Sequence, residues 1–193
     1  MGTQLVPNPI VNSSLLLPKE VLGATGIEAS RLGLGLVKIG RNEGLKYPAA
    51  FELPSDEAVY ELLKEAHSLG INLLDTAPAY GTSEQRLGDV LAQLPELAAS
   101  CIISTKVGES FENGKSSFDF SPDAIKHSVE RSLRRLGRTK LDIVLLHSSG
   151  ADEEVLTDQQ PLATLQQLQY EGVIGACGFS GKSLSGGRQA LAL

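Results

Sequence analysis

Short continuous runs of apolar residues alternate along the chain with stretches in which apolar residues recur every three or four positions. Short continuous runs are typical of strands buried on both faces, and the second spacing is typical of helices with one apolar face. We expect strands at residues 71–74, 101–103, 143–146 and 173–179. The alternation predicts an α/β protein with a parallel sheet covered by helices.

Helix boundaries are indicated by capping residues and glycines. Ser55 is expected to cap a helix that carries Val59, Leu62, Leu63, Ala66 and Leu69 and stops at Gly70. Thr82 and Gln85 have capping-box spacing ahead of Leu87, Val90, Leu91 and Leu94. Ser121 and Pro122 begin a third helix that ends at Gly137, and a fourth runs over about 161–171 before Gly172.

The N-terminal part divides into three expected segments. Residues 1–20 form an extended leader, and residues 21–32 form a β-hairpin in which Gly23 and Gly26 allow the turn. The run 31–40, RLGLGLVKIG, is predicted as the first core strand. Residues 21–193 then make up one domain.

Four polar residues directly follow or end the apolar strand segments: Asp75, Lys106, His147 and Ser180. Taken singly, Asp75 could form a turn, Lys106 could be solvated and His147 could be a loop histidine. Tyr80 alone could be a half-buried packing residue. Together they favour a (β/α)8 barrel, because a barrel brings successive strand ends to one rim, whereas a doubly wound sheet concentrates ligands at one switch point.

Three segments carry a resemblance to a known family: LLDTAPAYGTSEQRLGDVL, ISTKVG and LDIVLLHS. They resemble the aldo-keto reductases, and the similarity extends over residues 21–193. The resemblance implies a catalytic tetrad of Asp75, Tyr80, Lys106 and His147, with Asp75 and Ser180 also binding the cofactor. Where a common variant of the family has Asn after this serine, the chain has Gly181.

The resemblance implies NAD(P)H-dependent reduction of aldehydes or ketones, or oxidation of sugar or alcohol substrates. NADPH is the expected cofactor, with NADH as the alternative. Carbonyl reduction needs a hydride on carbon and a proton on oxygen, and Tyr80 is the expected acid. A lysine ammonium stabilises a phenolate, a carboxylate holds that lysine charged, and a histidine orients the substrate oxygen. A Rossmann site is the weaker reading, because Gly33 and Gly35 are followed by Lys38 where a third glycine should stand.

Charge and composition narrow the expected partners. The formal net charge is -6 and no basic stripe is present, which argues against nucleic acid. Cys101 and Cys177 lack the spacing of a zinc site, so we expect free thiols and no metal. The first residues resemble neither a signal peptide nor a membrane span, so a cytoplasmic protein without membrane association is expected.

Chain length bears on activity. A complete barrel takes about 250 residues, so the 193 residues are expected to form a barrel truncated after about five strands. The alternative function is therefore a truncated, non-catalytic fragment without cofactor binding. Two open sheet edges would also favour self-association and a marginally stable fold.

Overall fold

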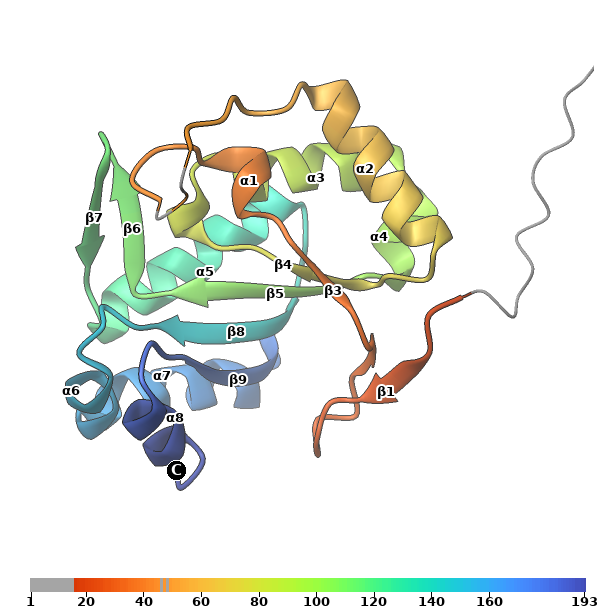
Figure 1. Cartoon of the computed structure of the whole chain (residues 1–193). Helices are drawn as coiled ribbons and strands as arrows, with labels where there is room; N and C mark the ends of the chain where they lie inside the picture. Colours follow the sequence, from red (N-terminus) through yellow and green to blue (C-terminus); the bar gives the residue numbers. More distant parts are fainter. Residues whose placement is uncertain (1–15, 46, 48) are drawn as a thin grey trace, which may run out of the picture.

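The computed structural model describes residues 16–45, 47 and 49–193. Most of the expected leader, residues 1–15, lies outside the described residues. One parallel sheet organises the chain, with the strand order β3-β4-β5-β8-β9 (Figure 1). Its strands are β3 (Gly33–Gly35), β4 (Leu73–Asp75), β5 (Ile102–Val107), β8 (Leu141–His147) and β9 (Ile174–Ser180).

Strand order distinguishes the (β/α)8 barrel from the doubly wound sheet. The spatial order of the five strands follows the chain without a reversal. A doubly wound sheet reverses its order at a switch point, whereas barrel strands succeed one another in sequence. The sheet is therefore five consecutive strands of a partial (β/α)8 barrel, which confirms the predicted fold class.

Helices follow the strands as predicted, and two of the three predicted caps are present. The main helices are α2 (Asp56–Ser68), α3 (Ser83–Gln93), α5 (Pro122–Leu136) and α7 (Gln159–Tyr170). The hydroxyl of Ser55 accepts from the Ala58 amide at 3.2 Å, and that of Ser121 accepts from Ala124 at 3.4 Å. Each bond satisfies an amide that a helix start would leave without a partner.

The core lies between the sheet and these helices. Among its fully buried side chains are Leu63 of α2, Leu87 of α3, Ile125 of α5 and Leu165 of α7, together with Ile103 of β5. Two residues predicted for the apolar face of α2 are instead about half exposed, namely Leu62 and Leu69. Only some of the regularly spaced apolar residues in α2 are therefore buried.

The N-terminal hairpin is present, but it spans residues 19–30 and so begins and ends two residues earlier than predicted. β1 (Lys19–Val21) pairs antiparallel with β2 (Glu28–Ser30). Gly23 and Gly26 in the connection have φ of 53° and 72°, a left-handed conformation that glycine adopts at little cost.

Two local predictions are wrong. The run 31–40 is not one strand, because the chain turns after β3 into the short helix α1 (Val37–Gly40). Thr82 does not cap α3 with its side chain, and its hydroxyl instead donates to the carbonyl of Gly40 at 3.5 Å. Both differences arise where α1 packs against the segment before α3, a tertiary contact that local spacing does not encode.

Several elements were not predicted: α4 (Pro95–Ser100), α6 (Asp152–Thr157), the 3-10 turn η2 (Pro78–Tyr80) and the hairpin of β6 (Glu109–Glu112) and β7 (Lys115–Phe118). Asn113 and Gly114 join β6 to β7 with φ of 52° and 76°. Positive φ at both positions is the conformation of a type I′ turn, for which Asn-Gly is the preferred pair. The Asn-Gly dipeptide was thus a readable signal for this hairpin.

Candidate active site

Lys106 and Asp75 form an ion pair at the carboxyl ends of neighbouring strands. The Lys106 ammonium donates to both carboxylate oxygens of Asp75 at 2.8 Å and to the Thr76 carbonyl at 2.9 Å. The Lys106 side chain is 5% exposed and that of Asp75 is 38% exposed. Three acceptors use the three N–H donors of the ammonium, so its position is fixed.

Tyr80 lies beside this pair at the end of η2. The Lys106 ammonium is 4.7 Å from the centroid of the Tyr80 ring. The η2 turn is anchored by the residue that follows α1, because the Arg41 guanidinium donates to the Ala79 carbonyl at 2.9 Å. The ammonium therefore lies over the Tyr80 ring in a cation–π contact.

His147 completes the group from the end of β8. Its ring is 6.1 Å from the Tyr80 ring, centroid to centroid, in an edge-to-face arrangement. Burial, together with the charges of Lys106 and Lys182, lowers the pKa of His147 to about 4, although Glu109 and Asp75 partly oppose the shift. The imidazole is therefore neutral at neutral pH and can offer only one N–H.

Glu109 on β6 is a site residue that the sequence reasoning missed. Its Oε2 lies 3.1 Å from Nδ1 of His147, and its Oε1 accepts from the Ser116 hydroxyl at 2.6 Å. Arg41 lies 3.9 Å from the same carboxylate. Burial lowers the pKa of Arg41, and Glu109 and Tyr80 oppose that shift. The hairpin thus places a second carboxylate behind the histidine.

Ser180, the last residue of β9, pairs in register with His147. Its hydroxyl makes no hydrogen bond within the described part of the chain, so it is free to meet a ligand. A Cβ on Gly181 would lie 2.6 Å from the Phe179 ring and 3.1 Å from Oδ2 of Asp152. An asparagine at this position would require those neighbours to move.

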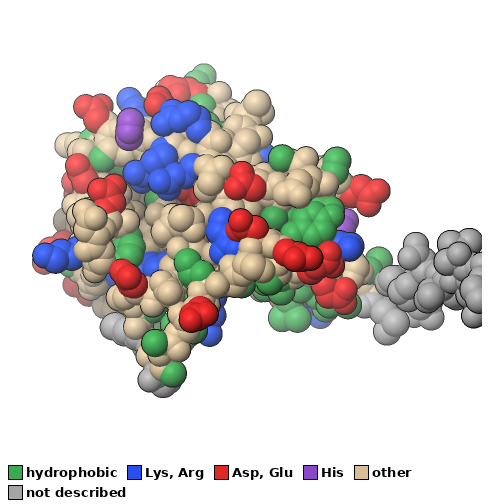
Figure 2. Space-filling view, turned by 90° about the horizontal axis from the view of Figure 1, so that it is seen from above, with side chains coloured by type: hydrophobic (Ala, Val, Ile, Leu, Met, Phe, Trp, Pro, Cys, Tyr) green, Lys and Arg blue, Asp and Glu red, His purple; other side chains and the backbone are tan. Residues whose placement is uncertain are grey.

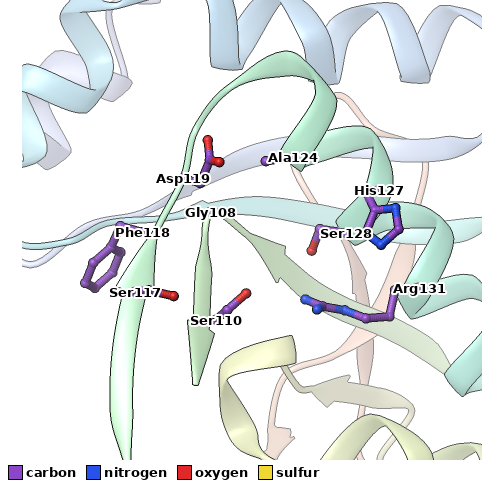
Figure 3. Close-up of a pocket in the computed structure, with 9 residues that line it drawn as sticks. All are labelled: Gly108, Ser110, Ser117, Phe118, Asp119, Ala124, His127, Ser128 and Arg131. Atoms are coloured by element: carbon purple, nitrogen blue, oxygen red, sulfur yellow. The ribbon is translucent and has the colours of Figure 1, made fainter. Parts of the chain in front are cut away.

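A cavity of about 400 Å³ lies apart from this group, between the hairpin β6–β7 and α5 (Figure 3). None of Asp75, Tyr80, Lys106 and His147 lines it. The candidate active site is therefore the cluster at the strand ends, and the cavity beside α5 is a separate feature.

The surroundings of the two cysteines do not activate their thiols. Cys101 is buried and Cys177 is half-buried, and both are free thiols. Burial raises the pKa of each thiol. Neither thiol is therefore activated as a nucleophile at neutral pH.

Fold and site together define an α/β-barrel protein whose ionisable residues gather at the carboxyl ends of the strands. The model of the aldo/keto reductase family matches residues 31–191. The chain belongs to that family.

Similar proteins include curated enzymes and solved structures. The chain is 34% identical to NADH-specific methylglyoxal reductase of Escherichia coli, over 84% of this chain and 51% of that protein. It is 35% identical to L-galactose dehydrogenase of Arabidopsis thaliana, over 86% of this chain and 49% of that protein. An aldo-keto reductase structure from Pseudomonas aeruginosa aligns with a TM-score of 0.82 and 44% identity, over 96% of this chain and 68% of that one.

The chain spans about half the length of the curated relatives it matches. Among the helices in the described ranges, none combines the length and apolar character that a membrane crossing requires.

Proposed function

We propose that the protein catalyses reduction of a small aldehyde or ketone, or the reverse oxidation of a sugar or alcohol, with NADPH or NADH as the hydride partner. The observation that carries this proposal is the meeting of Asp75, Tyr80, Lys106 and His147 at one rim of the sheet. Their combination supplies a proton donor, a fixed positive charge and a neutral imidazole in one place.

The residues at the rim suit a nicotinamide ring. The Ser180 hydroxyl has no internal partner among the described residues, and the Asp75 carboxylate is partly exposed. These two groups would hold the carboxamide side of the ring, and the bound cofactor would supply or accept the hydride.

Tyr80 is the proposed general acid. As the carbonyl carbon gains a hydride, the carbonyl oxygen takes the proton of the Tyr80 hydroxyl, and the resulting phenolate is stabilised by the Lys106 ammonium. Asp75 keeps that ammonium charged and aimed. In the oxidative direction the phenolate takes the proton back from the alcohol.

The similar proteins support a carbonyl or sugar substrate and leave the choice of cofactor open. One relative is named as an NADH-specific methylglyoxal reductase and another as an L-galactose dehydrogenase. We propose a cytoplasmic location, because a buried free thiol such as that of Cys101 is typical of proteins in a reducing compartment. Self-association through the edges at β3 and β9 is part of the proposal.

The test is turnover of methylglyoxal and of a simple aldose by the purified chain, with NADPH and with NADH. Tyr80→Phe should lower kcat by about two to four orders of magnitude while leaving cofactor affinity nearly unchanged. Tyr170→Phe is the matched control, because this tyrosine is 89% exposed and remote from the tetrad in sequence. Equal turnover in Tyr80→Phe and wild type would remove Tyr80 as the acid. Absence of both turnover and cofactor binding in a folded wild-type chain would favour the non-catalytic alternative.

A further inference from the structure

The cavity between the hairpin β6–β7 and α5, here the hairpin cavity, collects polar side chains from three segments (Figure 3). Ser110 and Ser117 come from the hairpin, and His127, Ser128 and Arg131 come from one face of α5. The volume of about 400 Å³ falls in the lower range of small-ligand sites. None of these residues takes part in the proposed reaction.

The hydroxyls of the hairpin cavity lack partners. Ser110 and Ser117 face each other across the β6–β7 ladder, and Ser128 is only 7% exposed. Within the described ranges, none of the three side chains makes a hydrogen bond to the protein. Buried hydroxyls in proteins usually have a partner, so the nearly buried Ser128 hydroxyl is open to a bound group, and the more accessible Ser110 and Ser117 can meet the same group.

Arg131 supplies the charge. Its side chain extends from α5 into the cavity toward Ser110 (Figure 3). Its Nε is buried without a hydrogen-bond partner, and among the residues with described positions it has no carboxylate within ion-pair distance. Arg135, one turn further along α5, is by contrast paired with Glu84 at 3.3 Å. Figure 2 shows basic side chains beside a histidine at the upper left of the face in view, with acidic side chains around them.

We propose that the hairpin cavity binds a phosphate group, either as inorganic phosphate or as the phosphate of a small monoester. A guanidinium with an unused fork of N–H donors suits the oxygens of a phosphate, and serine hydroxyls donate to the remaining ones. The site is distinct from the tetrad and goes beyond the proposed carbonyl chemistry.

One negatively charged residue borders the hairpin cavity and would repel an anion. Asp119 lines it, and the Ser121 amide, which donates to its carboxylate at 2.9 Å, lowers the pKa of that carboxyl. The carboxylate is therefore ionised, but it is fully exposed, so water and salt screen its repulsion of an anion. The Arg131 Nε is buried and is screened much less.

The experiment is a titration of the folded chain with inorganic phosphate at constant ionic strength, followed by NMR amide shifts. We expect saturable shifts confined to residues 108–119 and 124–131. Arg131→Gln should weaken binding at least about tenfold, equivalent to roughly 1.4 kcal/mol. Arg134→Gln, which removes the same charge from an exposed position on the same helix, should leave the affinity unchanged.

A second variant and two further ligands test which groups bind phosphate and which anions bind. Ser117→Ala should weaken binding to a smaller extent without perturbing the fold, because this residue is exposed. Glycerol 3-phosphate tests for a monoester, and acetate tests for a carboxylate ligand. Unsaturable shifts in wild type, equal losses in Arg131→Gln and Arg134→Gln, or acetate binding as tight as phosphate binding would each overturn the proposal.

Discussion

Nδ1 of His147 lies 3.1 Å from Oε2 of Glu109, yet the two groups do not have the geometry of a hydrogen bond. The separation alone would suggest a bonded pair, but direction decides, because hydrogen bonds weaken steeply away from linearity. The contact is therefore mainly electrostatic. A carboxylate beside Nδ1 favours a proton on that nitrogen, so Glu109 influences which nitrogen of the neutral imidazole carries the N–H.

The first prediction removes this charge. Glu109→Gln should lower the pKa of His147 below its wild-type value of about 4, because the carboxylate raises that pKa against the effects of burial and of Lys106 and Lys182. NMR titration of the imidazole measures it directly. Glu112→Gln, on the exposed end of the same strand, is the control and should leave the titration unchanged. An unchanged or raised pKa in Glu109→Gln would contradict the proposed coupling.

The second prediction concerns stability against pH. The pKa of His147 is about 4 in the folded protein against an ordinary 6.5, so between these values the unfolded chain binds the proton more readily. The free energy of unfolding should therefore fall as pH drops from about 6.5 toward about 4. Urea unfolding across this range measures the slope. His147→Asn should flatten it, whereas His67→Asn, on the outer part of α2, should not.

The third prediction tests the approach of α1 to η2. A Cβ on Gly40 would lie 2.1 Å from the Ser83 amide nitrogen and 2.4 Å from the Tyr80 carbonyl oxygen. Both neighbours are backbone atoms, so Gly40→Ala should destabilise the fold by about 1 to 3 kcal/mol and displace Tyr80. Gly35→Ala meets nothing within 4 Å and is the control. Equal unfolding midpoints for the two variants would show that the contact between α1 and η2 is not tight.

The fourth prediction concerns Asp152, which joins α6 to the segment after β9. Its carboxylate accepts from the hydroxyls of Ser148 and Ser183 and from the amides of Lys182 and Ser183. Although burial raises the pKa of Asp152, these hydrogen bonds outweigh it and lower the pKa to about 2.

Asp152→Ala should therefore cost at least about 1 to 3 kcal/mol of unfolding free energy, because several donors lose their acceptor. The wild-type contribution is present above about pH 4 and is lost as pH falls toward about 2, a window below that of His147. Denaturant unfolding of Asp152→Ala and of the exposed neighbour Glu153→Ala gives the comparison. A loss of the same size in Glu153→Ala would mean that α6 is sensitive to any truncation.

The sequence predicted that Asp75, Lys106 and His147 would lie together, because the carboxyl ends of parallel strands meet at one edge of the sheet, a rule that needs only the strands to be recognised. It missed Glu109, because that residue reaches His147 through a hairpin whose position depends on tertiary packing. The Asn-Gly turn signalled the hairpin but not which face would meet the barrel. Thr82 does not cap α3 for a similar reason, because its hydroxyl donates to the carbonyl of Gly40, which is distant in sequence.

The alternation of side chains along β6 also limits where the hairpin β6–β7 can change in length. Glu109 is directed to His147 and the adjacent Ser110 lines the hairpin cavity, because successive side chains of a strand point to opposite faces. One residue inserted between them would carry the carboxylate away from the histidine and toward Arg131, while an added residue at the Asn113–Gly114 turn leaves both faces in place. Homologous chains that keep both sites should therefore vary in length at this turn and not within β6.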